Sequence, residues 1–518
     1  MTKEKYYDII LLSIAYHLFR LLHLSSILPI VLPISIIFLS IVLYSPIVGN
    51  ILAFELEISE STSAFAVNSL NSTDSRYVNF RDPTNLSNNP RDSVYSQIAA
   101  YKNNVYIVWE EEATENTTPT TRGDVIRHDN RNYDIYFKKS TDGGGTFSKA
   151  INISNNSGFS EHPQIAISGR IVYIAWTDDA SFNKEILFKK SSDEGNNFGK
   201  TIKLSNDGGE SYNQEISAFA NNVYVVWENK FSANNTNDIK GISSTDGTSI
   251  DNNNKINSVS QELERLNNNH NNRILFKSST DRGNSFTNTR VITTNSEQTA
   301  ESYPKIAASN DSYVYIVWTI GMPPIGSDNA SSGYNKYTGN NKNTAEQNQG
   351  VFFTKSFDNG VNFMEIVKLN KDVNYVGESQ IASSGNEVYI TWSGNSDNLI
   401  PNDLFFIKST DNGNTFTEES SLRKNSSLNA ELAVTGNDVY IIWQDLLKPN
   451  NQEILIKKSL DRGNTFVNII TNISNNKGTS ECPSIAISKN FVYAVWEDDT
   501  PGNHEIFFAK SNNNNALR

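Results

Sequence analysis

The chain has 518 residues, a formal net charge of −13 and a single cysteine. Because this length exceeds the roughly 250–300 residues that one ordinary core supports, we expect several domains or one closed array of repeats. The negative charge and the lack of a basic stripe exclude nucleic acid as a predicted partner, and a single cysteine excludes an internal disulfide.

A hydrophobic segment comes first in the chain. No Lys, Arg, Asp or Glu occurs between residues 21 and 54, and residues 24–48 are apolar enough to cross the roughly 30 Å hydrocarbon layer of a bilayer. Lys and Arg precede this segment and Glu follows it, so the positive-inside rule places the N-terminus in the cytoplasm. The sequence therefore predicts a cytoplasmic tip and membrane anchor (1–54), an extracytoplasmic stalk (55–77) and an outside domain at the cell membrane. A cleaved signal, which would give a secreted protein, is the alternative.

A strand motif that ends in tryptophan recurs after this segment. All seven tryptophans close such a motif, of which Val105–Trp109 is the first copy. Where nothing is inserted the spacing is regular, with Trp176 and Trp227 lying 51 residues apart. This period is typical of propeller blades. Apolar residues on both sides of these strands indicate that both faces are covered, as in sheets that stack radially.

A polar turn with the pattern S-x-D-x-G-x-[TSN]-F follows the third strand of six units. Each aspartate is predicted to accept backbone N–H bonds inside its own turn, the glycine to supply a positive φ, and the phenylalanine to pack on the blade. We therefore interpret these aspartates as structural and expect no metal site there. They are Asp142, Asp193, Asp281, Asp358, Asp411 and Asp461.

These turns resemble the Asp-box, or bacterial neuraminidase repeat, of sialidase-like proteins, over about residues 78–511. The resemblance implies an all-β fold, a seven-bladed β-propeller of four-stranded blades, and says little about activity. A sialidase of the family would need three clustered arginines. Phe80-Arg81-Asp82-Pro83 resembles the family's [FY]-R-I-P motif, but Asp82 replaces the isoleucine.

The seventh unit ends without a fourth strand. Residues 78–89 have the pattern of the fourth strands in the other units, for example residues 150–156. We therefore expect residues 78–89 to be a closing strand, in a propeller that spans residues 78–518 and has no free edge.

Acidic residues recur in the loops opposite the Asp-boxes, before the first strands and after the tryptophans. A ring of carboxylates there would suit a cation or sugar hydroxyls, with calcium as the only candidate cofactor. The alternative is that these acids cap strands and solvate the rim. The candidate ligand-binding residues are Asp92, Glu161, Asp178, Asp179, Glu210, Glu301, Glu378, Glu431, Glu481 and Asp498.

These patterns lead to a functional hypothesis. We expect a membrane-anchored, non-catalytic propeller that binds a surface glycan or an extracellular protein on this acidic face. Two insertions, at about residues 228–272 and 319–350, are expected to lie over the same face. The alternatives are an exo-sialidase-like or other glycoside hydrolase, and a structural component of a surface layer. The catalytic residues of such a hydrolase are not identifiable from the sequence.

Overall fold

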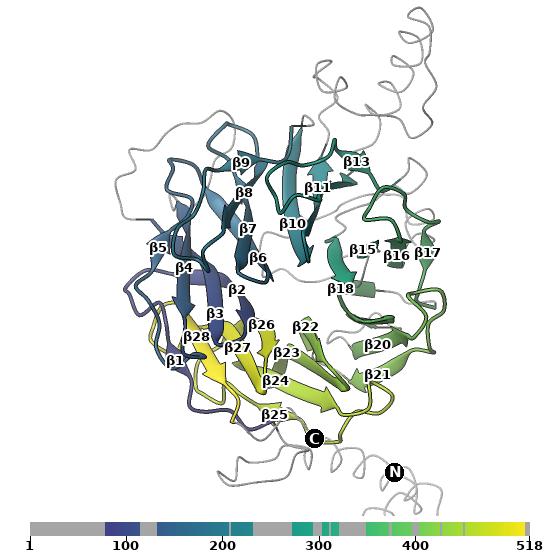
Figure 1. Cartoon of the computed structure of the whole chain (residues 1–518). Helices are drawn as coiled ribbons and strands as arrows, with labels where there is room; N and C mark the ends of the chain where they lie inside the picture. The colour runs from purple at the N-terminus through teal and green to yellow at the C-terminus, as the bar shows by residue number, and fades with distance from the viewer. Residues whose placement is uncertain are drawn as a thin grey trace, which may run out of the picture. The chain divides into compact units, whose positions relative to one another are not determined.

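The computed structural model describes one body of the chain (Figure 1). It covers residues 78–113, 132–206, 209–230, 272–293, 303–309, 312–320, 349–371, 375–395, 403–424, 427–448 and 451–512. The predicted anchor and stalk, the candidate Glu301 and most of both insertions lie outside these ranges. Within them, no helix has the length and hydropathy needed to span a membrane.

Seven antiparallel sheets of four strands form a ring in the described ranges, which confirms the predicted all-β, seven-bladed propeller (Figure 1). Blades 1 to 3, each listed from the axis outward, are β2–β5 (Ser93–Tyr101, Asn104–Glu112, Tyr133–Ser140, Ile151–Asn152), β6–β9 (Ser160–Ser168, Ile171–Asp178, Glu185–Ser191, Ile202–Lys203) and β10–β13 (Glu210–Phe219, Asn222–Lys230, Asn272–Ser279, Arg290–Val291).

Blades 4 to 7 follow in chain order. They are β14–β17 (Lys305–Ser309, Tyr313–Ile320, Gly350–Ser356, Val367–Lys368), β18–β21 (Tyr375–Ser384, Glu387–Asn395, Asp403–Ser409, Ser420–Arg423), β22–β25 (Ser427–Thr435, Asp438–Lys448, Asn451–Ser459, Thr471–Asn472), and β26–β28 (Ser480–Ser488, Phe491–Asp498, Glu505–Lys510) with β1 (Thr84–Asn85).

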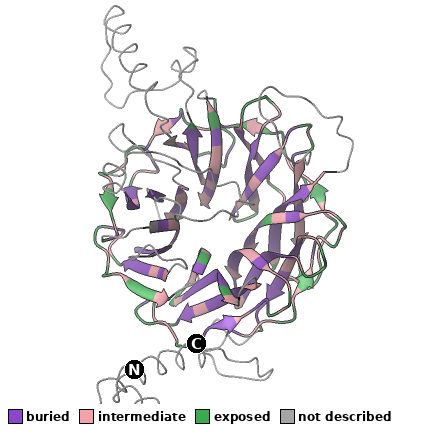
Figure 2. Cartoon of the chain, turned by 180° about the vertical axis from the view of Figure 1, so that it is seen from behind, coloured by how far each residue is buried: buried purple, intermediate pink, exposed green. Residues whose placement is uncertain are grey.

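The core lies between neighbouring blades. The second strand of each blade carries the tryptophan motif, and all seven tryptophans are fully buried. In Figure 2 the strands inside the blades are mostly buried, while exposed residues gather in the outer strands and loops. The second strands read as nearly continuous hydrophobic runs because packed sheets cover both of their faces.

The last blade takes its outer strand from the beginning of the propeller. β1 pairs antiparallel with β28, with Thr84 opposite Phe508, and an isolated bridge joins Phe80 to Ser511. The apolar side chains of Val78 and Leu86 are buried in this region. The edge of β28 is therefore covered, and the two ends of the ring meet in one sheet (Figure 1).

Each Asp-box closes its own turn. In the fifth blade the Asp411 carboxylate accepts bonds from the backbone N–H groups of Asn414 and Thr415, at 3.0 and 2.9 Å, and from the Ser409 hydroxyl at 2.7 Å. These bonds outweigh the effect of burial and lower the pKa of Asp411 to about 2. Gly413 has a φ of +71°, and a Cβ there would lie 2.8 Å from Phe353 of the preceding blade.

Candidate functional site

Two rows of side chains run around the axis of the ring. In six of the seven blades the innermost strand pairs with the tryptophan strand through a register shift, which we call the bulge, and in blade 4 the paired residues begin at Lys305. The axial row consists of the residues that pair with the position before each tryptophan, and the bulge row lies two residues earlier. The axial row is Gln97, Gln164, Glu215, Lys305, Gln380, Glu431 and Ser484. The bulge row is Tyr95, His162, Asn213, Tyr303, Glu378, Asn429 and Cys482.

The bulge has a structural function. At six of the seven bulge-row positions φ is positive, between 37° and 53°. At four of these positions the backbone N–H donates to the side chain of the residue that follows the tryptophan in the preceding blade. The Tyr303 amide donates to Glu228 at 2.5 Å, and the Tyr95 amide donates to Glu497 at 3.3 Å. The His162 amide donates to Glu110 in the same way. The acids that directly follow these tryptophans therefore join neighbouring blades.

The acids two residues after the tryptophans are also internal. Asp178 and Asp498 are buried, with 2% and 0% exposure, and each accepts a bond from the indole N–H of its own blade's tryptophan. Each also accepts a serine hydroxyl from the innermost strand, at 2.8 Å for Ser160 and 2.6 Å for Ser480. These two candidate ligand-binding residues therefore lie inside their blades and not on an open rim, with carboxylates that are bonded within the blade.

Three further candidates are held by local contacts. Asp179 accepts the Phe159 amide at 2.7 Å, and Asp92 accepts the His504 amide at 3.1 Å across the ring closure. Glu161 is buried and forms an ion pair of 2.5 Å with Lys184. These positions agree with the alternative in which the acids cap loops and strands.

The remaining described candidates do not share one position in the repeat. Glu210 is exposed at the start of β10, and Glu481 directly precedes the bulge in β26. Glu378 belongs to the bulge row and Glu431 to the axial row, so both lie inside the innermost strands. The expectation that the acids precede the first strands is therefore wrong at five described positions, which lie within those strands: Glu161, Glu210, Glu378, Glu431 and Glu481.

One group of charged side chains converges on the axis, and we call Glu215, Lys305, Glu378 and Glu431 the axial cluster. The ammonium of Lys305 lies 2.5 Å from the Glu215 carboxylate in the neighbouring blade, and both side chains are nearly buried, with 14% and 16% exposure. The Gln164 side-chain amide also donates to the Glu215 carboxylate, at 3.1 Å. The cluster thus combines three carboxylates with one ammonium group, which is paired with Glu215.

Burial and mutual repulsion shift the proton affinities in the axial cluster. Burial raises the pKa of Glu431 to about 7, although the charge of Lys305 opposes this shift. Burial also raises the pKa of Glu215. For Lys305 burial favours the neutral form, but the charges of Glu215 and Glu378 outweigh it and raise the pKa of the ammonium group. The cluster has more negative charge than its lysine compensates.

Bulge-row side chains from neighbouring blades contact one another beside the axial cluster. The Tyr95 and His162 rings lie 4.8 Å apart, and the Asn429 amide lies 3.7 Å from the Cys482 sulfur. Burial raises the pKa of the Cys482 thiol well above its usual value and lowers that of His162. Cys482 is half-buried at this row as a whole residue.

Arginine is absent from the described parts of the seven innermost strands, where Lys305 is the single basic residue of the axial row. Arg81 lies at the outer edge of the last blade, where its amide donates to the Lys510 carbonyl. Arg423 is paired with buried Asp445 at 2.9 Å. No group of three or more His, Cys, Asp or Glu side chains in the described ranges is arranged to hold a metal ion. The carboxylates of the axial cluster are hydrogen-bond acceptors and can bind donor groups such as hydroxyls and amines.

Sequence reasoning missed Glu215, Lys305 and His162 as members of this site. The sequence did contain a signal. Each of these residues lies in the innermost strand, at or two residues before the position that pairs with the residue preceding its blade's tryptophan. Reading that signal requires the register of the bulge, which the repeat spacing alone does not show.

Solved structures with a similar fold are distant in sequence. A protein of unknown function from Dyadobacter fermentans DSM 18053 is 12% identical, with a TM-score of 0.44 over 69% of this chain and 95% of that one. The NanB sialidase from Streptococcus pneumoniae is 10% identical, with a TM-score of 0.43 over 84% and 94%. The phage phi92 endosialidase is 11% identical, with a TM-score of 0.42 over 84% and 69%. At these values the likenesses carry no statement about activity.

Comparison of the sequence with curated proteins finds no match. A family model does match, under the description "BNR repeat-containing family member", over residues 256–515. This region is about half of the chain and includes four of the six Asp-boxes, those of Asp281, Asp358, Asp411 and Asp461. By this match and by its seven repeated blades, the chain belongs to the BNR repeat-containing family.

Proposed function

We propose that this protein is a non-catalytic binding module whose propeller holds a hydroxyl- or amine-bearing ligand, such as a surface glycan, at the axial cluster. The observation that carries the proposal is the charge of that cluster. Glu215 forms an ion pair with the single ammonium group of the cluster, that of Lys305, and the charges of Glu378 and Glu431 also act on this group. Buried carboxylates without full compensation are costly, so donor groups of a ligand would stabilise them.

The binding test uses the purified full chain in detergent. A glycan array, run with and without calcium, first selects a ligand, and calorimetry then measures its affinity. We expect the Glu378→Gln/Glu431→Gln double variant to bind at least ten-fold more weakly, a loss of about 1.4 kcal/mol. Glu210→Gln is the matched control, because it removes an exposed carboxylate outside the cluster. Equal loss in both variants, or unchanged affinity in the double variant, would exclude the axial cluster as the site.

The proposal includes a location. The apolar segment at residues 24–48 supports a single-pass anchor in the cell membrane with the propeller outside. Carbonate extraction of membranes tests the anchor, and protease added to intact cells tests the side on which the propeller lies. Release of the whole chain by carbonate, or protection of the propeller in intact cells, would contradict this part of the proposal.

The hydrolase alternative gains no support from the described residues. Three arginines around the axis would favour a sialidase-like enzyme, and the described parts of the innermost strands contain none. An extracellular protein remains the other class of partner. Binding to such a protein with no signal on the glycan array would redirect the proposal from a glycan to a protein ligand.

A further inference from the structure

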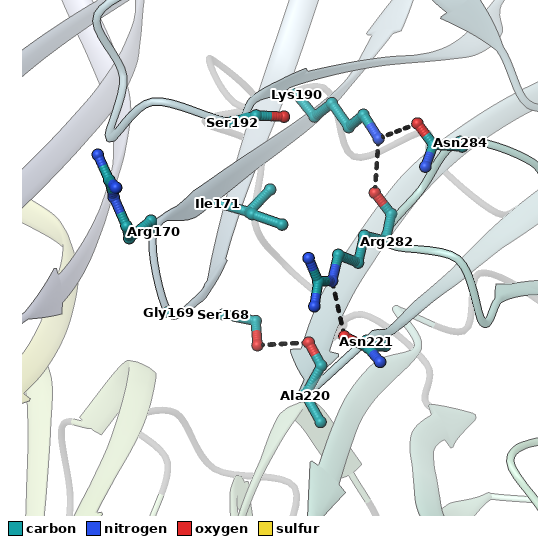
Figure 3. Close-up of a pocket in the computed structure, with 10 residues that line it drawn as sticks. All are labelled: Ser168, Gly169, Arg170, Ile171, Lys190, Ser192, Ala220, Asn221, Arg282 and Asn284. Atoms are coloured by element: carbon teal, nitrogen blue, oxygen red, sulfur yellow. Dashed lines mark hydrogen bonds between the residues drawn. The ribbon is translucent and has the colours of Figure 1, made fainter.

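A cavity of about 550 Å³ opens between blades 2 and 3, at the end of the propeller where the Asp-box turns lie (Figure 3). Its ten lining residues include three cations, Arg170, Lys190 and Arg282, and no acid. This lining contrasts with a chain whose net charge is −13. We call this cavity the hairpin-face pocket. The axial cluster lies elsewhere and contributes none of its lining residues.

The repeat supplies an internal comparison, because the junction between blades 5 and 6 is built from the same contacts. Arg282 donates to Asn221 at 2.7 Å, and Arg462 donates to Asn437 at 2.7 Å. Lys190 donates to the Arg282 carbonyl at 2.8 Å. The corresponding bond from Lys408 to the Arg462 carbonyl is also 2.8 Å. Because the two junctions share these contacts, they can be compared residue by residue.

The decisive difference is a carboxylate. At the junction of blades 5 and 6, Glu387 lies 3.6 Å from Arg462 and accepts the Tyr389 hydroxyl at 2.6 Å. Ile171 occupies the corresponding position at the junction of blades 2 and 3, as the first residue of its tryptophan strand. An aliphatic side chain thus replaces the acid that neutralises the arginine.

This replacement removes a carboxylate acceptor from the surroundings of Arg282 and Tyr173. Among the described residues Arg282 has no carboxylate partner, and the hydroxyl of fully buried Tyr173 has no hydrogen-bond partner. Tyr173 corresponds to Tyr389, and both rings contact the glycine of the following Asp-box, at Gly283 and Gly463. Tyr173 does not line the pocket, so the group available to a ligand is the Arg282 guanidinium, which is suited to an anionic partner from outside the chain.

The other lining residues suit a ligand larger than a bare ion. Arg170 is 72% exposed and bonded to Glu194, whereas the corresponding residue of the sister junction is Asn386. In Figure 3 Ile171 lies between Arg170 and Arg282, with Ser168 and Asn221 nearby. Hydroxyl and amide side chains around a pocket of this size can bind sugar hydroxyls.

We propose that the hairpin-face pocket binds an acidic sugar, whose carboxylate or sulfate pairs with Arg282 in the place that Glu387 occupies beside Arg462. Arginine suits this role because its planar fork of donors matches both oxyanions. The proposal stands apart from the function assigned to the axial cluster, and the two have separate tests.

The test is calorimetry on the full chain in detergent with glucuronate, glucose 6-sulfate, glucose and sodium sulfate as probes. We expect an acidic sugar to bind at least ten-fold more tightly than glucose and than inorganic sulfate. Arg282→Gln should weaken this binding at least ten-fold, whereas Arg462→Gln, which changes the neutralised arginine of the sister junction, should leave it unchanged. Ile171→Glu should abolish the binding and raise the melting temperature, because it restores the missing carboxylate.

Three outcomes would overturn the proposal. Equal effects of Arg282→Gln and Arg462→Gln would show that the pocket arginine has no special role. Equal affinity for glucose would remove the need for an anion, and equal affinity for inorganic sulfate would indicate a site for a bare ion only. If Ile171→Glu fails to fold, Arg282→Glu takes its place, and it should abolish acidic-sugar binding, whereas Arg462→Glu should leave the binding unchanged.

Discussion

The Glu497 carboxylate accepts the backbone N–H of Tyr95 at 3.3 Å, joining residues that lie 402 positions apart in the chain. This bond closes the ring near its axis, whereas the pairing of Thr84 with Phe508 closes it at the outer rim. The first and last blades are thus joined at both ends of the radial sheet. Stability of the propeller should depend on both connections.

The outer connection predicts the effect of truncation. Deleting residues 55–90 removes β1 with buried Val78 and Leu86 and exposes the edge of β28, so we expect a much lower melting temperature or aggregation. Deleting residues 55–74 leaves these contacts intact and should be nearly silent. Thermal unfolding and size-exclusion chromatography of the two truncated chains check this. If both melt alike as soluble monomers, closure by β1 does not stabilise the ring.

The Asp-box turns predict a stability effect without a binding effect. Asp411→Ala removes the acceptor of two turn N–H groups and the Ser409 hydroxyl, but water can reach those N–H groups. We therefore expect the free energy of unfolding to fall by about 1 kcal/mol, with ligand affinity unchanged. Chemical denaturation measures the first and calorimetry the second. Glu365→Ala, which removes an exposed carboxylate after another Asp-box, is the control. Lost binding at unchanged stability would mean that the box itself binds ligand.

The axial cluster predicts a pH dependence of stability. The pKa of Glu431 is raised to about 7 in the folded state from an ordinary value of 4.5, so the folded protein holds a proton that the unfolded chain releases. Its contribution to stability is full below about pH 4.5 and is lost as the pH rises to about 7. We expect the melting temperature to be higher at pH 5.5 than at pH 8.

Glu431→Gln should reduce the difference in the free energy of unfolding between pH 5.5 and pH 8 by an amount on the order of 1 kcal/mol, because the neutral amide does not titrate. Glu497 has a pKa of about 7 for the same reason, burial, so part of the difference should remain. Glu365→Gln, an exposed site, is the control. A melting profile of Glu431→Gln that coincides with the wild type from pH 5 to 8 would exclude Glu431 as the titrating group.

The arginine positions predict that sialosides are not hydrolysed. Arg81 is exposed at the outer edge of the last blade, on the side of the sheet opposite the innermost strand. A fluorogenic sialoside incubated with the pure full chain should give the same signal as buffer. Turnover that disappears in the Arg81→Ala variant would establish the enzyme instead.

The sequence by itself determined the blades, because the interactions that define them are local. Ser409, Asp411 and Thr415 lie within seven consecutive positions, so a single hairpin satisfies the Asp-box wherever it occurs. The tryptophan strands are similarly readable, since burial on both faces demands a continuous apolar run. For these reasons the blade number and the structural role of the Asp-box aspartates follow from pattern alone.

Only the tertiary structure decided which charged side chains lie close to one another. Glu215 and Lys305 are 90 residues apart and belong to different blades, and the position of Glu215 at the axis depends on the bulge in its strand. The same shift moved Glu431 to the axis, while burial of Asp178 beside Trp176 removed it from the rim. Side-chain direction in a strand reverses with a shift of one residue, so periodicity located the acids in the repeat without giving the direction in which they point.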